Sequence, residues 1–168
     1  QALARRVAAK LARWGVIPDS SAGEALAGCP CGVLAGLVAR SAVDPLHPVT
    51  LLAILKHPYV RLGGAVEALE RHGLRGARPW TWEGLRARLA ERPDALALAD
   101  RIEAILAGLP RDGRRPAEAA RAVAAAMEAL AADDRGDTGD LWSGHGGEAM
   151  SRLLAALIAD SSGLPEAS

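Results

Sequence analysis

Six arginines and two tryptophans gather between residues 71 and 92, and these are the residue types in the sequence that could do chemistry. Only Glu83 and Glu91 oppose the arginines, so the local formal charge is +4. An arginine guanidinium can donate two parallel hydrogen bonds to the oxygens of one phosphate. A tryptophan ring can stack on a base or on a guanidinium. The candidate residues for a DNA or partner contact are Arg75, Arg78, Trp80, Trp82, Arg86 and Arg88.

The same stretch also fits a structural interpretation. One or both tryptophans would then pack in the core, and the arginines would form a solvated helix face, as charged side chains usually do. The sequence favours this structural interpretation. The interleaving of Trp80 and Trp82 with the arginines nevertheless keeps a contact role open.

Elsewhere the sequence offers no group of residues at catalytic or ligand spacing. It has no Gly-x₄-Gly-Lys-Ser/Thr phosphate loop, no Gly-x-Ser-x-Gly turn and no His-Glu-x-x-His zinc motif. The four histidines lie far apart, and the Asp-rich run 133–140 lacks the register of a calcium loop. Cys29 and Cys31 are spaced Cys-Pro-Cys, which matches neither a zinc knuckle nor a disulfide framework. We therefore predict no catalytic, cofactor-binding or metal-binding residues in this chain.

The composition predicts a helical protein with no long-range electrostatic attraction for nucleic acid. Half of the 168 residues are hydrophobic, mostly alanine and leucine, which favour helices, and phenylalanine is absent. The formal net charge is zero, so the chain as a whole does not attract polyanions or an acidic membrane surface. With no secretory signal and no apolar run of about 18 residues, we expect a cytoplasmic protein with no membrane contact. The chain begins inside a helical pattern without a methionine, so we expect a piece of a larger protein.

The elements that must position the arginines and tryptophans are helices, because apolar residues recur with a period of 3.6 along most of the chain. No strand alternation appears after Ile17, so we predict an all-α fold, an irregular bundle of about seven or eight helices. The expected helices cover residues 3–14, 32–42, 48–57, 63–72, 82–91, 94–106, 116–132 and 146–160. An extended segment follows the first of these helices, and Gly73 is expected to close the fourth.

The stretch from His47 to Gly63 predicts the central helix of the core. Pro48 suits its first position, and the residues that follow are apolar on nearly every side. Such a helix is normally buried on all sides. We interpret His47, Lys56 and His57 as helix-end residues and not as catalytic groups.

Three stretches of this sequence, in order, resemble AddB, the second large subunit of the bacterial AddAB helicase–nuclease, in its alphaproteobacterial form. They are LARRVAAKLARWGVIPDSSAGEALAGCPCG (residues 3–32), LLAILKHPYVRLG (51–63), followed by LRGARP, and LWSGHGGEAMSRLLAALI (141–158). Together they span nearly the whole chain. None is a catalytic signature. The sequence departs from the family pattern at His145 and Gly146, and at Cys29-Pro30-Cys31.

The resemblance implies a place within a larger protein. Residues 1–28 would be the edge of a 2A-like motor domain, and residues 29–168 a helical insertion like the 2B domain of superfamily 1 helicases. The parent protein would be an ATP-dependent helicase/exonuclease subunit that uses magnesium and an iron–sulfur cluster, with these sites outside this chain. Cys29 and Cys31 are not expected to be cluster ligands.

The function implied by the resemblance is that of a non-catalytic helical module in double-strand break resection and homologous recombination. The module would contact an AddA-type partner subunit, the DNA backbone, or both. An alternative is a free-standing helical protein–protein interaction domain with no role at DNA.

Overall fold

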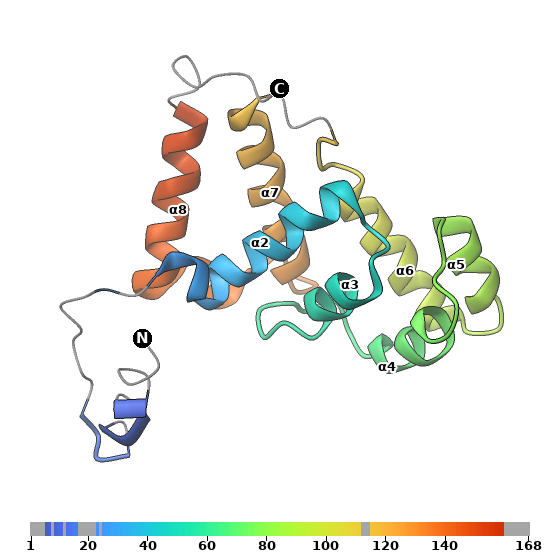
Figure 1. The fold of residues 1–168 in the computed structure, drawn as a ribbon, viewed down its shortest axis with the longest axis horizontal. Coiled ribbons are helices and arrows are strands. Elements are labelled where there is room, and N and C mark those ends of the chain that lie inside the picture. Colours follow the sequence, from blue (N-terminus) through green and yellow to red (C-terminus); the bar gives the residue numbers. More distant parts are fainter. Residues whose placement is uncertain are drawn as a thin grey trace.

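The computed structural model describes residues 6–7, 9–11, 13–16, 23, 25–111 and 115–159. Every regular element within these ranges is helical, so the predicted all-α class is confirmed (Figure 1). Five of the twelve residues of the predicted helix 3–14, and most of the extended segment after it, lie outside the described residues, and residues 6–7 and 9–11 are helical. No helix in the described part combines the length and hydrophobicity that a membrane crossing requires.

The helices begin and end within a few residues of the predicted positions, except around Gly73. In chain order they are η1 (Leu26–Gly28), α2 (Pro30–Val43), α3 (Pro48–Leu55), α4 (Val66–Ala68), η2 (Leu69–Leu74), α5 (Trp82–Leu89), α6 (Pro93–Leu106), α7 (Pro116–Ala131), η3 (Gly139–Trp142) and α8 (Gly144–Ala159). The segment η2 is a π-helical continuation of α4.

Proline and two side-chain caps set the helix starts. A proline occupies the first position of α2, α3, α6 and α7, where its missing N–H removes no helical hydrogen bond. The Nδ1 atom of His47 accepts a hydrogen bond from the backbone N–H of Thr50, and the Thr81 hydroxyl accepts one from Gly84. The helix-end role predicted for His47 is therefore confirmed.

Helix α2 joins two groups of helices around one hydrophobic core. It packs against α3, α7 and α8 along its length, whereas α5 packs against η2 and α6 at the other end of the molecule (Figure 1). Leu34 and Val38 of α2 are fully buried, as are Leu85 of α5 and Leu130 of α7. The loop before α5, which carries several candidate residues, is thus anchored from both sides.

Two local predictions are wrong. Helix α3 is not buried on all sides, because Val49 at its start is 71% exposed while Leu51, Ile54 and Leu55 face the core. Gly73 does not close the fourth helix with a left-handed turn. It is buried inside η2, where an added Cβ atom would lie 2.7 Å from Leu85 Cδ1, so its missing side chain lets η2 pack against α5.

Candidate contact surface

The candidate residues lie on one loop and on the helix that follows it. Arg75, Arg78 and Trp80 belong to the loop between η2 and α5, and Trp82, Arg86 and Arg88 belong to α5. Gly76 has φ of +87°, the left-handed conformation that glycine adopts without strain, and it turns the chain after η2. The Thr81 cap then starts α5.

The two tryptophans have different environments. Trp82 is half-buried and packs against the hydrophobic core. Trp80 is 78% exposed, and it is one of the few large apolar side chains on the described surface. The structural interpretation of the sequence therefore holds for Trp82 but not for Trp80.

Arg78 holds Trp80 in place and ties the loop to α2. Its guanidinium carbon lies 4.6 Å from the centroid of the Trp80 ring, within range of a cation–π interaction. The same guanidinium forms an ion pair with Asp44, the residue that follows α2. The Arg78 Nε atom is buried and has no hydrogen-bond partner. The arginine is thus largely committed to contacts within the chain.

Two of the other arginines are also paired with carboxylates. Arg86 Nε donates to Asp100 Oδ1 at 2.7 Å, and the same side chain pairs with Glu103 one turn along α6. The hydrogen bond to Asp100 raises the pKa of Arg86 above its usual value, and the charge of Glu103 adds to this effect. Arg75 lies 3.4 Å from a carboxylate oxygen of Glu70.

Glu70 is shared between two cations. Its other oxygen lies 2.6 Å from the Lys56 ammonium at the end of α3, and this hydrogen bond is the main reason why the pKa of Glu70 lies below its usual value. Arg75 lowers the same pKa further. The predicted helix-end role of Lys56 is confirmed, since it is the C-cap residue of α3 and also joins that helix to η2.

The remaining arginines of the stretch also form contacts within the chain. Arg71 pairs with Glu67 one turn before it, Arg88 Nη1 donates to the Gly73 carbonyl at 3.3 Å, and Arg92 donates to the Glu91 carbonyl. Four of the six arginines between residues 71 and 92 therefore face carboxylates in the folded chain. The +4 charge counted along the sequence is offset by Asp44, Glu67, Glu70, Asp100 and Glu103, which all lie outside that stretch.

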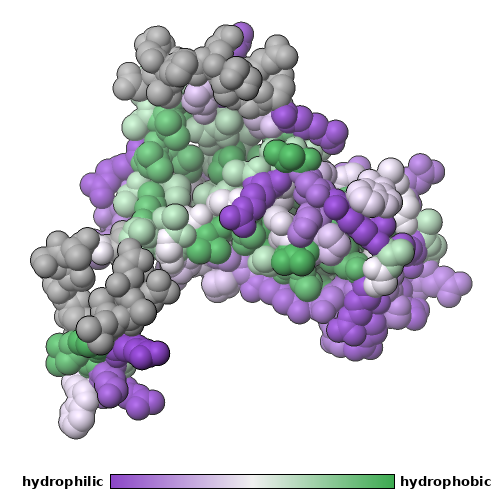
Figure 2. All heavy atoms as spheres, viewed as in Figure 1, coloured by the Kyte–Doolittle hydropathy of each residue, from purple (hydrophilic) through white to green (hydrophobic). Residues whose placement is uncertain are grey.

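Val43, the last residue of α2, directly precedes Asp44 and is also exposed. We call Val43, Asp44, Arg78 and Trp80 the Trp80 patch. Hydrophilic side chains cover most of the surface over α4 and α5, with separate hydrophobic areas over α2 and α3 (Figure 2). Sequence reasoning missed Val43 and Asp44, because nothing local connects them to a loop more than thirty residues away.

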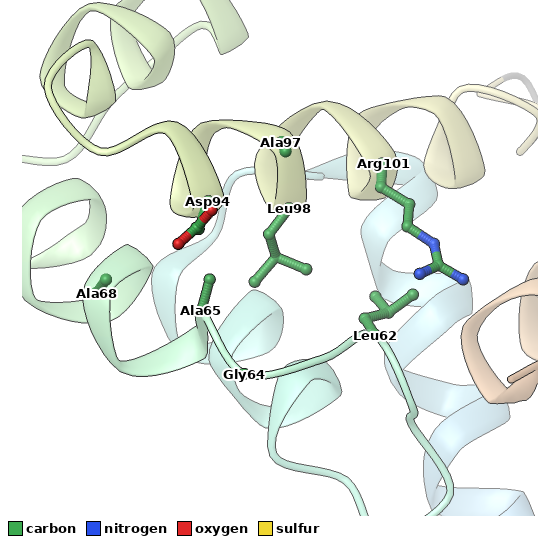
Figure 3. Close-up of a pocket in the computed structure, with 8 residues that line it drawn as sticks. All are labelled: Leu62, Gly64, Ala65, Ala68, Asp94, Ala97, Leu98 and Arg101. Atoms are coloured by element: carbon green, nitrogen blue, oxygen red, sulfur yellow. The ribbon is translucent and has the colours of Figure 1, made fainter. Parts of the chain in front are cut away.

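A cavity of about 540 Å³ lies on another part of the surface, between α6 and the segment before α4. Leu62, Ala65 and Leu98 line its apolar part, and Asp94 and Arg101 lie toward its two ends (Figure 3). None of the six candidate residues reaches this cavity. Among the described residues, no three His, Cys, Asp or Glu side chains are grouped as metal ligands.

No family model matches the sequence, and neither a curated protein nor a solved structure is significantly similar to the chain.

Proposed function

We propose that this chain is a non-catalytic helical module of an AddB-type helicase–nuclease subunit, and that it works by binding a protein partner, the AddA-type subunit. The proposal is supported by the three ordered stretches that resemble the family and is compatible with the all-helical fold. The parent complex would resect broken duplex ends before homologous recombination. The module itself would hold the two subunits in register.

The observation that carries the choice of partner is the exposure of Trp80. A tryptophan buries about 150–250 Å² when it is covered, and tryptophan and arginine are the residues most enriched among the energetic centres of protein interfaces. Trp80 is already oriented by Arg78, which is itself fixed by Asp44. A preordered aromatic side chain loses little conformational freedom on binding, so more of its contact energy appears as affinity.

DNA backbone binding is less well supported, because it requires cations that are free to replace counterions. Arg75, Arg78 and Arg86 each face a carboxylate within the chain. A phosphate would have to displace these intramolecular partners before it could bind. This competition favours a protein partner for the surface around Trp80.

The proposal is tested by sedimentation of the AddA-type subunit with this chain and with two tryptophan variants. Trp80→Ala is expected to weaken complex formation at least tenfold, as the loss of about 2 kcal/mol at an interface centre requires. Trp14→Ala is the matched control, since Trp14 is also highly exposed, at 83%, but lies outside the Trp80 patch. Equal affinity of the Trp80→Ala variant and the wild type would overturn the proposed contact.

A free-standing interaction domain is the second candidate, and the exposed Trp80 favours it equally. The reading frame that surrounds the coding sequence separates the two. A downstream nuclease motif with cluster-type cysteines supports the AddB-type module, whereas a stop codon directly after the codon for Ser168 supports the free-standing domain.

A further inference from the structure

The two cysteines lie together at the start of α2, away from the Trp80 patch. Cys29 is the N-cap residue of this 14-residue helix, and Cys31 is its second residue. The Cys29 side chain is half-buried, whereas Cys31 is 1% exposed and belongs to the hydrophobic core. No disulfide joins them. Cys29 is thus the residue of the two that is partly open to solvent, and Cys31 is closed to it.

The two sulfur atoms converge on one glycine of α8. A Cβ atom added to Gly146 would lie 3.3 Å from Cys29 Sγ and 3.5 Å from Cys31 Sγ. Because both sulfurs lie this close to the same added atom, they can be at most 6.8 Å apart. The Cα atoms of residues two apart lie roughly 5.5–7 Å from each other, which overlaps the range of about 4.4–6.8 Å that disulfides span. The backbone separation of Cys29 and Cys31 therefore lies within the range that a disulfide can span.

The surroundings of the two cysteines are polar on one side. Burial raises the pKa of Tyr59, and electrostatic interactions with Cys31, Asp140 and Cys29 raise it further, so the phenol lies within electrostatic range of both thiols. The ring of His57 lies 5.5 Å from that of Tyr59, and burial lowers the pKa of this histidine, which also interacts with the backbone of Pro30. Pro30, the residue between the cysteines, therefore lies close to His57, two residues after the end of α3.

We propose that Cys29 and Cys31 form a dithiol site that undergoes thiol–disulfide exchange with small-molecule disulfides, with Cys29 as the attacking thiol and Cys31 as the resolving thiol. This inference is independent of the proposed function. The deprotonated sulfur of Cys29 attacks one sulfur of the small disulfide, forms a mixed disulfide and releases one thiolate. Cys31, after losing its proton to water, attacks Cys29 Sγ and releases the second thiolate. The chain loses two electrons and two protons, and the small disulfide is reduced to two thiols.

The division of roles follows from position. The attacking sulfur must meet a molecule from solvent, which only Cys29 can do without local opening. The start of a long helix favours the negative charge that this sulfur carries before it attacks. The resolving sulfur needs only to reach its neighbour, and burial protects Cys31 from other reactions. A bond between residues two apart closes a very short loop, so it adds little stability and is expected to be readily reversed.

The experiment incubates the folded chain with oxidised glutathione, quenches the mixture with acid and measures the intact mass and the peptide that carries both cysteines. Wild type is expected to lose two hydrogens and to retain no glutathione. Cys31→Ser is expected to retain one glutathione on Cys29. Cys29→Ser is expected to react at least about tenfold more slowly, since its remaining thiol is buried.

Three results would overturn the proposal. In the first, the wild-type reaction stops at the mixed disulfide. In the second, neither wild-type thiol reacts until urea is added, and in the third, the two serine variants react at equal rates in their folded states. Circular dichroism establishes that each variant is folded. If a variant fails to fold, the wild-type peptide alone decides, because the intramolecular disulfide is either present or absent in it.

Discussion

Arg78 is held between Trp80 and Asp44: its guanidinium stacks on the ring at 4.6 Å and pairs with the carboxylate beyond the end of α2. The contact joins a loop to a helix 34 residues earlier in the chain. The sequence alone suggested that Arg78 could bind a phosphate. In the fold, the same side chain supports an exposed aromatic ring. This arrangement supports the proposal that the surface contacts a protein and not a polyanion.

The coupling between Arg78 and Asp44 is expected to be measurable in the free energy of unfolding. A double-mutant cycle of Arg78→Ala and Asp44→Ala in urea should give about 0.5–1 kcal/mol, because the arginine is partly buried and the pair is screened only in part. The pair of Arg71 and Glu67 is the control, since both of its side chains are more exposed, and it should give a smaller coupling. A larger coupling for the control pair would contradict the structural role given to Arg78.

Two glycines of α2, four residues apart, should respond oppositely to alanine. At Gly32 an added Cβ atom would lie 1.9 Å from the Leu26 carbonyl oxygen, so Gly32→Ala must displace backbone and should destabilise the fold by 1 kcal/mol or more. At Gly36 nothing lies within 4 Å, so Gly36→Ala should stabilise by roughly 0.5–1 kcal/mol through helix propensity. Urea denaturation of both variants checks this. Stabilisation by Gly32→Ala would show that η1 does not pack against α2 as described.

The buried His57 should make stability depend on pH. Burial lowers its pKa below the usual 6.5, so the unfolded chain binds the proton more readily than the folded one. The stability that this histidine contributes is complete above pH 6.5 and is lost as the pH falls from there through the lower folded-state pKa. Between pH 7.5 and 5, His57→Gln should flatten the fall of unfolding free energy, whereas the surface variant Val49→Ala should keep the wild-type slope. An unchanged slope for His57→Gln would contradict this prediction.

Two leucines near the end of the described chain separate core from surface. Leu141 of η3 is fully buried, and Leu141→Ala should cost about 2–5 kcal/mol in unfolding free energy because it leaves a cavity. Leu153 of α8 is 46% exposed, and Leu153→Ala should change stability by about 0.5 kcal/mol or less. If the two variants lose similar amounts of unfolding free energy, the face of α8 that carries Leu153 is buried, which would contradict the fold described here.

Local sequence signals predicted most of the fold, because the residues that start and end each helix lie within one or two turns of one another in the sequence. Pro48 and Pro116 mark helix starts where they are expected, and the position of His47 before Pro48 predicted its helix-end role. Gly73 was misjudged because glycine signals both a helix end and a close packing contact. Only the close contact with Leu85 shows that Gly73 is a packing position and not a helix end, and this contact forms only in the tertiary structure.

The candidate site was less predictable, since its character depends on residues that are distant in sequence. The charge count over residues 71–92 could not include Asp44 or the acidic pair on α6, Asp100 and Glu103, which reach Arg86 across the contact between α5 and α6. An acidic pair spaced three residues apart on the next helix was the one available signal. The convergence of Cys29 and Cys31 on Gly146 likewise required the packing of α8 against the start of α2.

The most direct measurement is fluorescence anisotropy of a labelled forked duplex titrated with this chain at a low and a high salt concentration. We predict no binding at either concentration, because the arginines around Trp80 are engaged within the fold. The variant with Arg75, Arg78, Arg86 and Arg88 all changed to alanine should behave in the same way. Binding by wild type that weakens steeply with salt, and that the quadruple variant lacks, would contradict the account and make this surface a DNA contact.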